Sequence, residues 1–308
     1  MSPERNHNLH LAANAQDMRF ETIFRVIQRL LQQEGIPLIL LKGPHLAHTV
    51  YDHPHERIYG DLDILVKPGD FNKAARILLE NKFTLLEDNE KNLATMTQTN
   101  HWAFLSRSGQ LIELHRGFTG LDRHPIDLDA WFARAEEFNY GQTPALGLAT
   151  EDFLCHLCLH IGKSFFYIIE PKHIQDLDVL IRKRKIGWDA FISRCQETRS
   201  RTIAFYCLSA AMAQYRTPVP GAVRSALLPR PWRRKWLDKY LNVSAFPIYR
   251  FHLKGVEHAR WRLTLPLLDG VGNWIPFVAR VTWVRGLDVV LRVPLFGRLW
   301  KKKVDSRQ

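Results

Sequence analysis

The stretch RIYGDLDILVKP, residues 57–68, is the most informative segment of the sequence, because a strand pattern in it carries two acidic side chains. Successive side chains of a β-strand point to opposite faces of the sheet. Asp61 and Asp63 therefore share one face, whereas Leu62 and Ile64 share the other. The segment predicts a buried strand with one acidic face and one face in the core.

The segments around this strand predict a mixed α/β arrangement. Apolar residues at helical spacing predict a helix over residues 20–31, and PLILLKG (37–43) predicts a short buried strand that leads into a helix. An amphipathic helix is expected after an N-cap at Asp70. The segments HWAFLS (101–106) and QLIELHR (110–116) are separated by a Gly-containing turn, which predicts a hairpin.

From residue 151 the pattern changes to consecutive helices that continue to about residue 215, which is typical of a helical bundle. The stretch YGQTPALGLATED (140–152) is the expected boundary, with Thr150 as a helix cap. We therefore predict an α+β fold, a mixed sheet with helices followed by an all-helical domain. The expected parts are an α/β domain with an N-terminal helix over residues 1–145, a helical domain over 146–245 and a basic amphipathic segment over 246–308.

The composition limits the partners and the surroundings of the chain. Its 308 residues include 43 Lys and Arg against 31 Asp and Glu, a formal net charge of +12 that favours an anionic partner such as nucleotide, nucleic acid or lipid headgroup. Four cysteines do not form a disulfide framework, and the N-terminus has no apolar stretch like a signal peptide, so we expect a cytoplasmic protein. No long run of uncharged apolar residues predicts a membrane-spanning helix.

A later strand carries a third carboxylate, because Glu113 shares one face with Leu111 and His115. If this strand neighbours the one with Asp61 and Asp63, three carboxylates converge. Carboxylates packed together raise one another's pKa, and a bound divalent cation removes that penalty. Oxygen ligands favour Mg²⁺ or Mn²⁺. Two such ions, typically about 3.5 to 4 Å apart, support an in-line phosphoryl displacement.

The order of LLKG (40–43), GDLDILV (60–66) and IELH (112–115) resembles the DNA polymerase beta-like nucleotidyltransferase superfamily. It is more closely similar to a bacterial nucleotidyltransferase family whose members read LLKG, R-x-x-GDxDxLV and ELHW. The resemblance extends into the helical half and covers residues 38–215. It implies the mixed-sheet fold of that superfamily and a nucleotidyl-transfer activity.

The resemblance also implies roles for individual residues. Asp61 and Asp63 match the paired metal-binding aspartates of the family, and Glu113 matches its third carboxylate. Lys42 and Gly43 stand where the wider superfamily usually has Gly-Gly or Gly-Ser. Small residues let backbone amides approach a triphosphate, whereas a lysine must reach it with a flexible ammonium group. The resemblance therefore implies nucleotide binding at this Lys-Gly turn, with the Lys42 ammonium as the group that reaches the phosphates.

Five further residues are candidates for the same site. Arg57 and Gly60 precede the aspartate pair and are candidate nucleotide-binding residues, with surface ion pairing as the alternative for Arg57. His101 and His115 flank the hairpin and can line the cleft as hydrogen-bond donors or general bases, although a structural role is equally open for each. His160 is a third candidate cleft-lining histidine.

His156 and His160 lie four residues apart on a predicted helix, with Cys155 and Cys158 interleaved. This spacing can bring two imidazoles to one metal ion, but all four side chains cannot face one point. Apolar neighbours make packing inside the helical bundle the main expectation. A zinc site and a lining of the nucleotide cleft are the alternatives.

Together these observations predict a metal-dependent nucleotidyltransferase, with Mg²⁺ or Mn²⁺ held by Asp61, Asp63 and Glu113. We expect it to move a nucleotidyl group, with AMP as the expected group, from a nucleoside triphosphate to an unknown hydroxyl or phosphate acceptor. Lys42 and Arg57 are expected to steady the phosphates. Such phosphoryl transfer depends mainly on positioning and charge.

Two alternatives stay open. The first is a catalytically inactive nucleotide-binding protein. The second is a membrane-surface or nucleic-acid-associated adaptor that uses the basic C-terminal half, because the tail from Asn273 mixes tryptophan and phenylalanine with basic residues. Segment 246–308 would then make peripheral contact with the anionic inner membrane surface.

Overall fold

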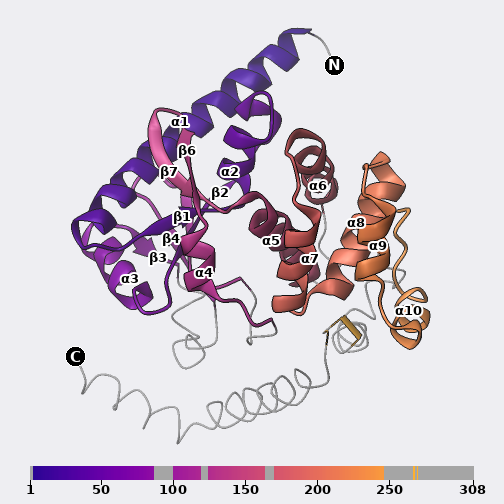
Figure 1. Ribbon diagram of the computed structural model, residues 1–308. Coiled ribbons are helices and arrows are strands. Elements are labelled where there is room, and N and C mark those ends of the chain that lie inside the picture. Colours follow the sequence, from indigo (N-terminus) through magenta and orange to yellow (C-terminus); the bar gives the residue numbers. More distant parts are fainter. Residues whose placement is uncertain are drawn as a thin grey trace, which may run out of the picture.

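The computed structural model describes residues 3–86, 100–118, 124–163, 170–245, 266–267 and 269. A five-stranded sheet lies at the centre of the N-terminal part, with the strand order β1-β2-β5-β4-β3 (Figure 1). The strands are β1 (Leu38–Leu40), β2 (Asp61–Val66), β3 (Thr84–Leu85), β4 (His101–Leu105) and β5 (Leu111–His115). Strands β2 and β5 are parallel and the other neighbours are antiparallel. The mixed sheet of the predicted α+β fold is confirmed.

The two faces of β2 meet two different cores. Leu62 and Ile64 are fully buried in one hydrophobic cluster together with side chains of α1 (Pro3–Gln33) and of α3 (Phe71–Glu80). Leu65 belongs to a second cluster, formed mainly by the helices that follow the sheet. Because side chains alternate along a strand, Asp61 and Asp63 point to the same side as Leu65. The acidic face of β2 therefore faces the helical half of the chain.

Helix α1 extends from Pro3 to Gln33, much further back than the predicted helix over residues 20–31. In Figure 1 it runs along the outer side of the sheet. The part of α1 before residue 20 makes polar contacts, and a search for apolar residues at helical spacing does not predict such contacts. Gln16 donates a hydrogen bond to the Tyr59 carbonyl at 2.6 Å, and Asp17 accepts one from the Tyr59 hydroxyl. Among the described residues, no helix is long and apolar enough to cross a bilayer.

The stretch over residues 140–152, where the sequence predicts a domain boundary, contains most of a second small sheet. Strands β6 (Glu136–Tyr140) and β7 (Thr143–Gly147) form a hairpin whose turn includes Gly141 at φ 58°, a left-handed conformation that favours glycine. Helix α4 (Leu128–Ala133) precedes it. The predicted boundary after residue 145 falls inside β7, and the division of the chain into domains stays a prediction.

The consecutive helices predicted for residues 151–215 are confirmed, and Thr150 is the first residue of α5 instead of a cap before it. Helix α5 lies between the sheet and the remaining helices in Figure 1 and packs against α6, α7 and α8. The helices are α5 (Thr150–Lys163), α6 (Pro171–Lys183), α7 (Trp188–Glu197), α8 (Arg201–Tyr215), α9 (Gly221–Leu227) and α10 (Pro231–Leu237).

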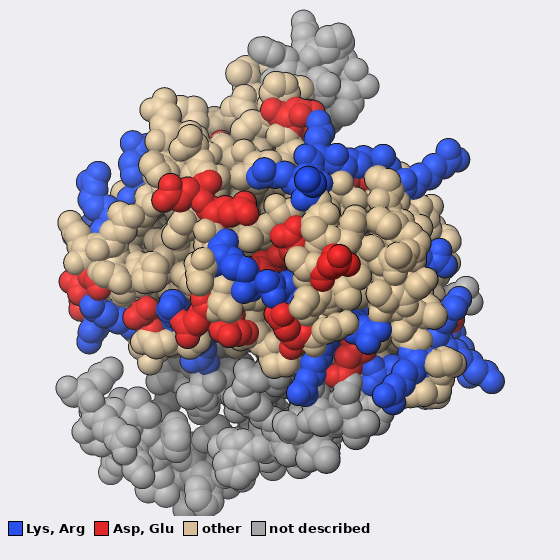
Figure 2. Space-filling model, in the orientation of Figure 1, with Lys and Arg blue, Asp and Glu red and all other residues tan. Residues whose placement is uncertain are grey.

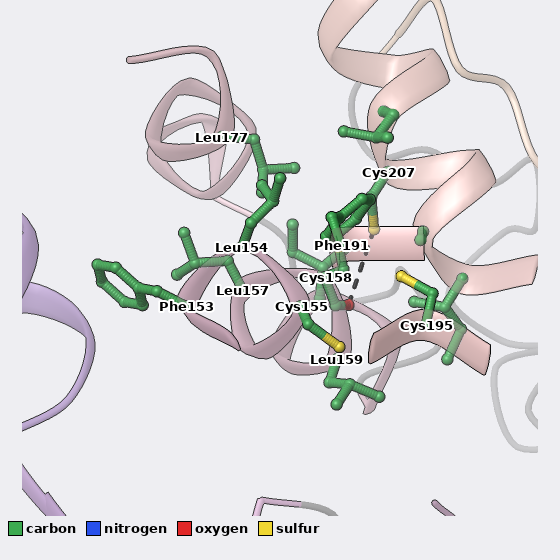
Figure 3. Close-up of a cluster of buried hydrophobic side chains, with 14 of the residues drawn as sticks. Phe153, Leu154, Cys155, Leu157, Cys158, Leu159, Leu177, Phe191, Cys195 and Cys207 are labelled. Carbon is green, nitrogen blue, oxygen red and sulfur yellow. Dashed lines mark hydrogen bonds between the residues drawn. The ribbon is translucent and has the colours of Figure 1, made fainter. Parts of the chain in front are cut away.

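The core of this helical region includes all four cysteines. Figure 3 shows Cys155 and Cys158 of α5 among leucine and phenylalanine side chains, beside Cys195 of α7 and Cys207 of α8. All four thiols are buried and free of disulfides. His156 is only 2% exposed in the same helix. Packing inside the bundle is thus confirmed for Cys155, His156 and Cys158, whereas His160 is only partly buried.

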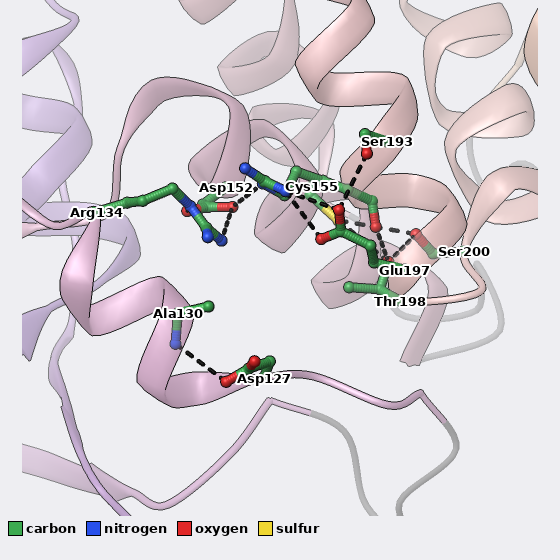
Figure 4. Close-up of polar contacts among 10 residues, drawn as sticks. Asp127, Ala130, Arg134, Asp152, Cys155, Ser193, Glu197, Thr198 and Ser200 are labelled. Carbon is green, nitrogen blue, oxygen red and sulfur yellow. Dashed lines mark hydrogen bonds and ion pairs between the residues drawn. The ribbon is translucent and has the colours of Figure 1, made fainter.

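Buried ion pairs connect α5 and α6 to the N-terminal half. Asp152 of α5 binds Arg134 at the end of α4 at 2.8 Å and Arg194 of α7 at 3.1 Å (Figure 4). Asp176 of α6 accepts two hydrogen bonds from the Arg57 guanidinium, at 2.7 and 2.9 Å. Arg57 and Asp176 are 6% and 1% exposed, so this pair is closed off from water.

We expect Arg57→Met to lower the free energy of unfolding by about 3 kcal/mol, because it leaves the Asp176 carboxylate buried without its cation. Urea unfolding measures the change. The matched control is Lys183→Met, since Lys183 of α6 binds Asp52 at 2.7 Å in an exposed pair, and such pairs contribute at most about 1 kcal/mol. A loss in Arg57→Met as small as in the control would contradict a stabilising role.

His45 of α2 (Lys42–Thr49) is an imidazole buried in an aromatic sandwich. Its ring stacks on Phe138 of β6 at 4.9 Å and on Phe153 of α5 at 4.2 Å between centroids. Its Nδ1 has no hydrogen-bond partner in the described part of the chain. Burial, together with the nearby Arg184 charge, lowers the pKa of His45 to about 3.

This lowered pKa makes the fold sensitive to acid. Between about pH 6.5 and 3 the unfolded chain binds a proton at His45 that the folded chain excludes, so stability falls as the pH falls, by about 1.4 kcal/mol per pH unit. His45→Phe keeps a ring in the sandwich and removes this contribution. Urea unfolding at pH 6.5 and pH 5 should therefore show a smaller loss for the variant than for the wild type. An equal loss of unfolding free energy in the variant and the wild type would contradict a lowered pKa of His45 as the cause.

Candidate active site

The parallel pairing of β2 with β5 brings the three predicted carboxylates together. Asp63 pairs in register with Glu113, and Asp61 lies two residues earlier on the same face. One carboxylate oxygen from each of Asp61, Asp63 and Glu113 lies within 4.8 Å of the other two. The convergence expected from the sequence, which required the two strands to be neighbours, is confirmed.

Two nitrogen atoms offset the negative charge at the centre of this group. Lys42 Nζ donates a hydrogen bond to Asp63 Oδ1 at 2.5 Å, and His115 Nε2 lies 2.7 Å from the same oxygen. His115 Nε2 is also 3.2 Å from Glu113 Oε2. Because Asp63 is only 1% exposed, its carboxylate depends on these partners in place of water.

The three carboxylates differ in acidity because their partners differ. Burial and the neighbouring Asp63 charge raise the pKa of Asp61 to about 6. Burial would also raise the pKa of Asp63, but the Lys42 ammonium and the hydrogen bond from His115 hold it well below its usual range. The pKa of Glu113 is lowered, since the hydrogen bond from His115 offsets the effect of burial. At neutral pH the three carboxylates are an anionic group of oxygen donors, which fits Mg²⁺ or Mn²⁺.

The Lys-Gly turn, the first two residues of α2, is built by close packing. Lys42 has φ 46°, in the left-handed region that residues other than glycine rarely adopt. Such backbone strain persists only where the surroundings hold it, and here the preceding Leu41 amide donates to the Asp63 carbonyl at 3.0 Å. A Cβ on Gly43 would lie 2.5 Å from Tyr59 Cβ, so only glycine fits there. The turn thus aims Lys42 at Asp63.

The other predicted nucleotide-binding residues lie in different surroundings. The Arg57 guanidinium is bound to Asp176 and to the Ile58 carbonyl, so its contact with phosphate stays a prediction. Gly60 has open space where a Cβ would stand, unlike Gly43. Its nucleotide contact likewise stays a prediction. The sequence offered no signal for the Arg57–Asp176 pair, because the partners are 119 residues apart.

Of the three candidate histidines, the structure brings two to the carboxylates. His101 pairs with His115 across β4 and β5, and its Nε2 lies 4.0 Å from Glu113 Oε1. His160 of α5 instead has His156 and His173 as ring neighbours, at 6.4 and 5.3 Å between centroids. Burial and the Lys42 charge hold the pKa of His160 well below its usual range.

His156 is buried in the bundle, as expected, but the sequence did not indicate that it also lies near Lys42. Its ring contacts Phe118 with centroids 4.4 Å apart, and neither ring nitrogen has a hydrogen-bond partner among the described residues. Burial lowers its pKa strongly, and the charge of Lys42 adds to the shift. A neutral imidazole on α5 therefore lies within electrostatic reach of the carboxylates.

Solved structures similar to this chain are nucleotidyltransferases and nucleotidyltransferase-like proteins. The antibiotic-resistance factor ANT(2'')-Ia is 12% identical, with a TM-score of 0.42 over 61% of this chain and 95% of that chain. The lincosamide antibiotic adenylyltransferase LnuA is 13% identical, with a TM-score of 0.35 over 52% of this chain and 95% of that chain. An antigenic nucleotidyltransferase-like protein from Paracoccidioides brasiliensis is 14% identical, with a TM-score of 0.35 over 71% of this chain and 91% of that chain.

No curated protein matches the chain in sequence. A family model described as uncharacterised nucleotidyltransferase matches residues 6–215, more than half of the 308 residues. This range contains the carboxylate group, the Lys-Gly turn and the helices as far as α8. The predicted resemblance and the predicted enzyme class are thereby confirmed. The chain belongs to the uncharacterised nucleotidyltransferase family.

Proposed function

We propose that this chain is a metal-dependent nucleotidyltransferase that moves AMP from a nucleoside triphosphate to a hydroxyl or phosphate acceptor. The observation that carries the proposal is the convergence of Asp61, Asp63 and Glu113 from two parallel strands, with ligand atoms within 4.8 Å. Three carboxylates in a partly buried site repel one another unless a cation offsets their charge, and the chain belongs to a family described as nucleotidyltransferase.

The three carboxylates are the residues that would hold the divalent ion. When bound, such an ion polarises phosphoryl oxygens and offsets the charge that develops during transfer. Glu113 is ionised at neutral pH and offers an oxygen that can accept the proton of an acceptor hydroxyl. The positions of these groups on adjacent strands limit their movement, which favours transfer through orientation.

Lys42 has a second task in this proposal. Its ammonium group is bound to Asp63 and is largely buried, with 14% of the side chain exposed. Neutralisation of Asp63 by a divalent ion would release the ammonium from this contact, and its four-carbon stem can then turn toward the triphosphate. Lys42 would in this way balance the site before nucleotide binding and bind phosphate afterwards.

The alternative functions have less support. The membrane-surface adaptor depended on segment 246–308, which lies outside the described residues except for 266–267 and 269. On the face drawn in Figure 2, acidic and basic side chains are interspersed instead of forming one basic surface. An inactive nucleotide-binding protein would hold a metal–triphosphate complex with the same three carboxylates. Transfer of a labelled nucleotidyl group from a triphosphate to an acceptor therefore distinguishes the proposed enzyme from both alternatives.

Asp63→Asn should lower the rate of pyrophosphate release by at least about 1,000-fold. It removes a negative charge that would hold the divalent ion, and the ion would supply several kcal/mol of transition-state stabilisation. The assay incubates α-labelled triphosphates with Mg²⁺ or Mn²⁺ and a panel of hydroxyl and phosphate acceptors. Asp129→Asn is the matched control, since Asp129 is 81% exposed in its pair with Lys67. If the wild type binds triphosphate but neither releases pyrophosphate nor labels an acceptor, the chain is a nucleotide-binding protein without transfer activity.

Lys42→Met should have opposite effects on metal and on nucleotide. Without the competing ammonium, Mn²⁺ binding to the nucleotide-free protein should tighten by about tenfold, the equivalent of one hydrogen bond to a charged group. Triphosphate binding should weaken. Calorimetric titration measures both affinities, and Lys67→Met, from the exposed pair with Asp129, is the control. Unchanged or weaker Mn²⁺ binding in Lys42→Met would refute the two-task assignment.

A further inference from the structure

A second group of possible metal ligands lies beside the three carboxylates. His101, Glu113 and His115 each offer one ligand atom, and these atoms lie within 4.8 Å of one another. In the β4–β5 pairing His101 stands opposite His115 and Ala103 stands opposite Glu113. Paired residues and residues two apart share one face of a sheet. The three side chains are therefore on the face that also carries the carboxylates.

The distances in this group suit a small metal ion. His115 Nε2 is 3.2 Å from Glu113 Oε2, and His101 Nε2 is 4.0 Å from Glu113 Oε1. Zinc binds histidine nitrogen and carboxylate oxygen at about 2.0 to 2.2 Å, which places neighbouring ligand atoms of a tetrahedral site roughly 3.3 to 3.6 Å apart. Both distances are within about 0.7 Å of that spacing.

The imidazole of His101 is available as a ligand. It is half-buried at the start of β4, and its Nε2 lies 4.0 Å from Glu113 Oε1, on the same face of the sheet. The neutral imidazole of histidine is a common metal ligand. His115 Nε2 lies 2.7 Å from Asp63 Oδ1 and 3.2 Å from Glu113 Oε2. A metal ion bound to Nε2 would take the place of the proton that this nitrogen shares with the two carboxylates.

We propose that His101, Glu113 and His115 form a second metal position that takes a transition-metal ion of the Zn²⁺ class and rejects Mg²⁺. Imidazole nitrogen suits zinc and its neighbours in the first transition row, whereas Mg²⁺ binds oxygen ligands in octahedral geometry. Glu113 carries two oxygens and is shared with the three-carboxylate position. The proposal concerns metal binding alone, so it stands or fails independently of nucleotidyl transfer.

Surface histidines are the main competitor for Zn²⁺. His55 stacks on His10 with ring centroids 4.3 Å apart and on His53 at 5.3 Å. Such a stack can bind Zn²⁺ without any relation to the candidate active site. The experiment therefore needs one variant in each histidine group.

The test measures Zn²⁺ and Mg²⁺ binding to the full-length chain, stripped of metal by a chelator and free of nucleotide, by calorimetry and equilibrium dialysis. The variants are His101→Gln, which replaces the imidazole with a polar side chain of similar length, and the matched control His55→Gln. Circular dichroism verifies that both are folded. Loss of a residue that merely orients a ligand weakens metal binding by about 10- to 100-fold, so loss of a direct ligand should weaken one Zn²⁺ site by at least about 100-fold.

We expect His101→Gln to lose this Zn²⁺ site and to keep Mg²⁺ binding, and Asp61→Asn to weaken Mg²⁺ binding and keep the Zn²⁺ site. Co²⁺ as a probe should give the visible absorption of a low-symmetry site in the wild type and lose it in His101→Gln. Zn²⁺ stoichiometry and affinity that change in His55→Gln but not in His101→Gln would overturn the proposal. Failure of the transfer assay with an intact Zn²⁺ site would overturn the proposed function instead.

Discussion

Mutual repulsion among Asp61, Asp63 and Glu113 is the constraint on which the arrangement of this site depends. The parallel register of β2 and β5 places Asp63 beside Glu113, and burial removes the water that would otherwise screen them. Lys42 and His115 supply the opposing interactions at Asp63. The unusual backbone of Lys42 at φ 46° follows from this requirement, since the turn must direct its ammonium to one buried oxygen.

The helical half completes the surroundings of these charges. The acidic face of β2 faces the cluster that α5 shares with the sheet, and the imidazoles of His156 and His160 on α5 are within electrostatic reach of Lys42. Buried pairs on α5 and α6 hold this helix layer in place, with Asp152 binding Arg134 and Asp176 binding Arg57. Arg57, which the sequence predicts to contact phosphate, thus connects the two halves of the chain through Asp176.

The sequence predicted the elements whose formation depends on local pattern. Asp61 and Asp63 alternate with Leu62 and Ile64 in β2, and a Gly-containing turn between two apolar runs predicted the β4–β5 hairpin. The β6–β7 hairpin was missed because Gly, Pro and Thr in residues 140–147 are typical of a linker. It forms strands because Tyr140 and Ala145 are buried against α1 and its neighbours. The part of α1 before residue 20 was also missed, because Gln16 and Asp17 are held by contacts with Tyr59, which is distant in the sequence.

The sequence by itself determined which side chains carry the chemistry and on which face of each strand they lie, because alternation along a strand is a local property. Only the tertiary structure decided that β2 and β5 are neighbours, that Lys42 and His115 both reach Asp63, and that Arg57 turns to Asp176. Strand pairing and buried ion pairs join residues from 21 to 119 positions apart. Such contacts depend on how the whole core packs, which no local pattern records.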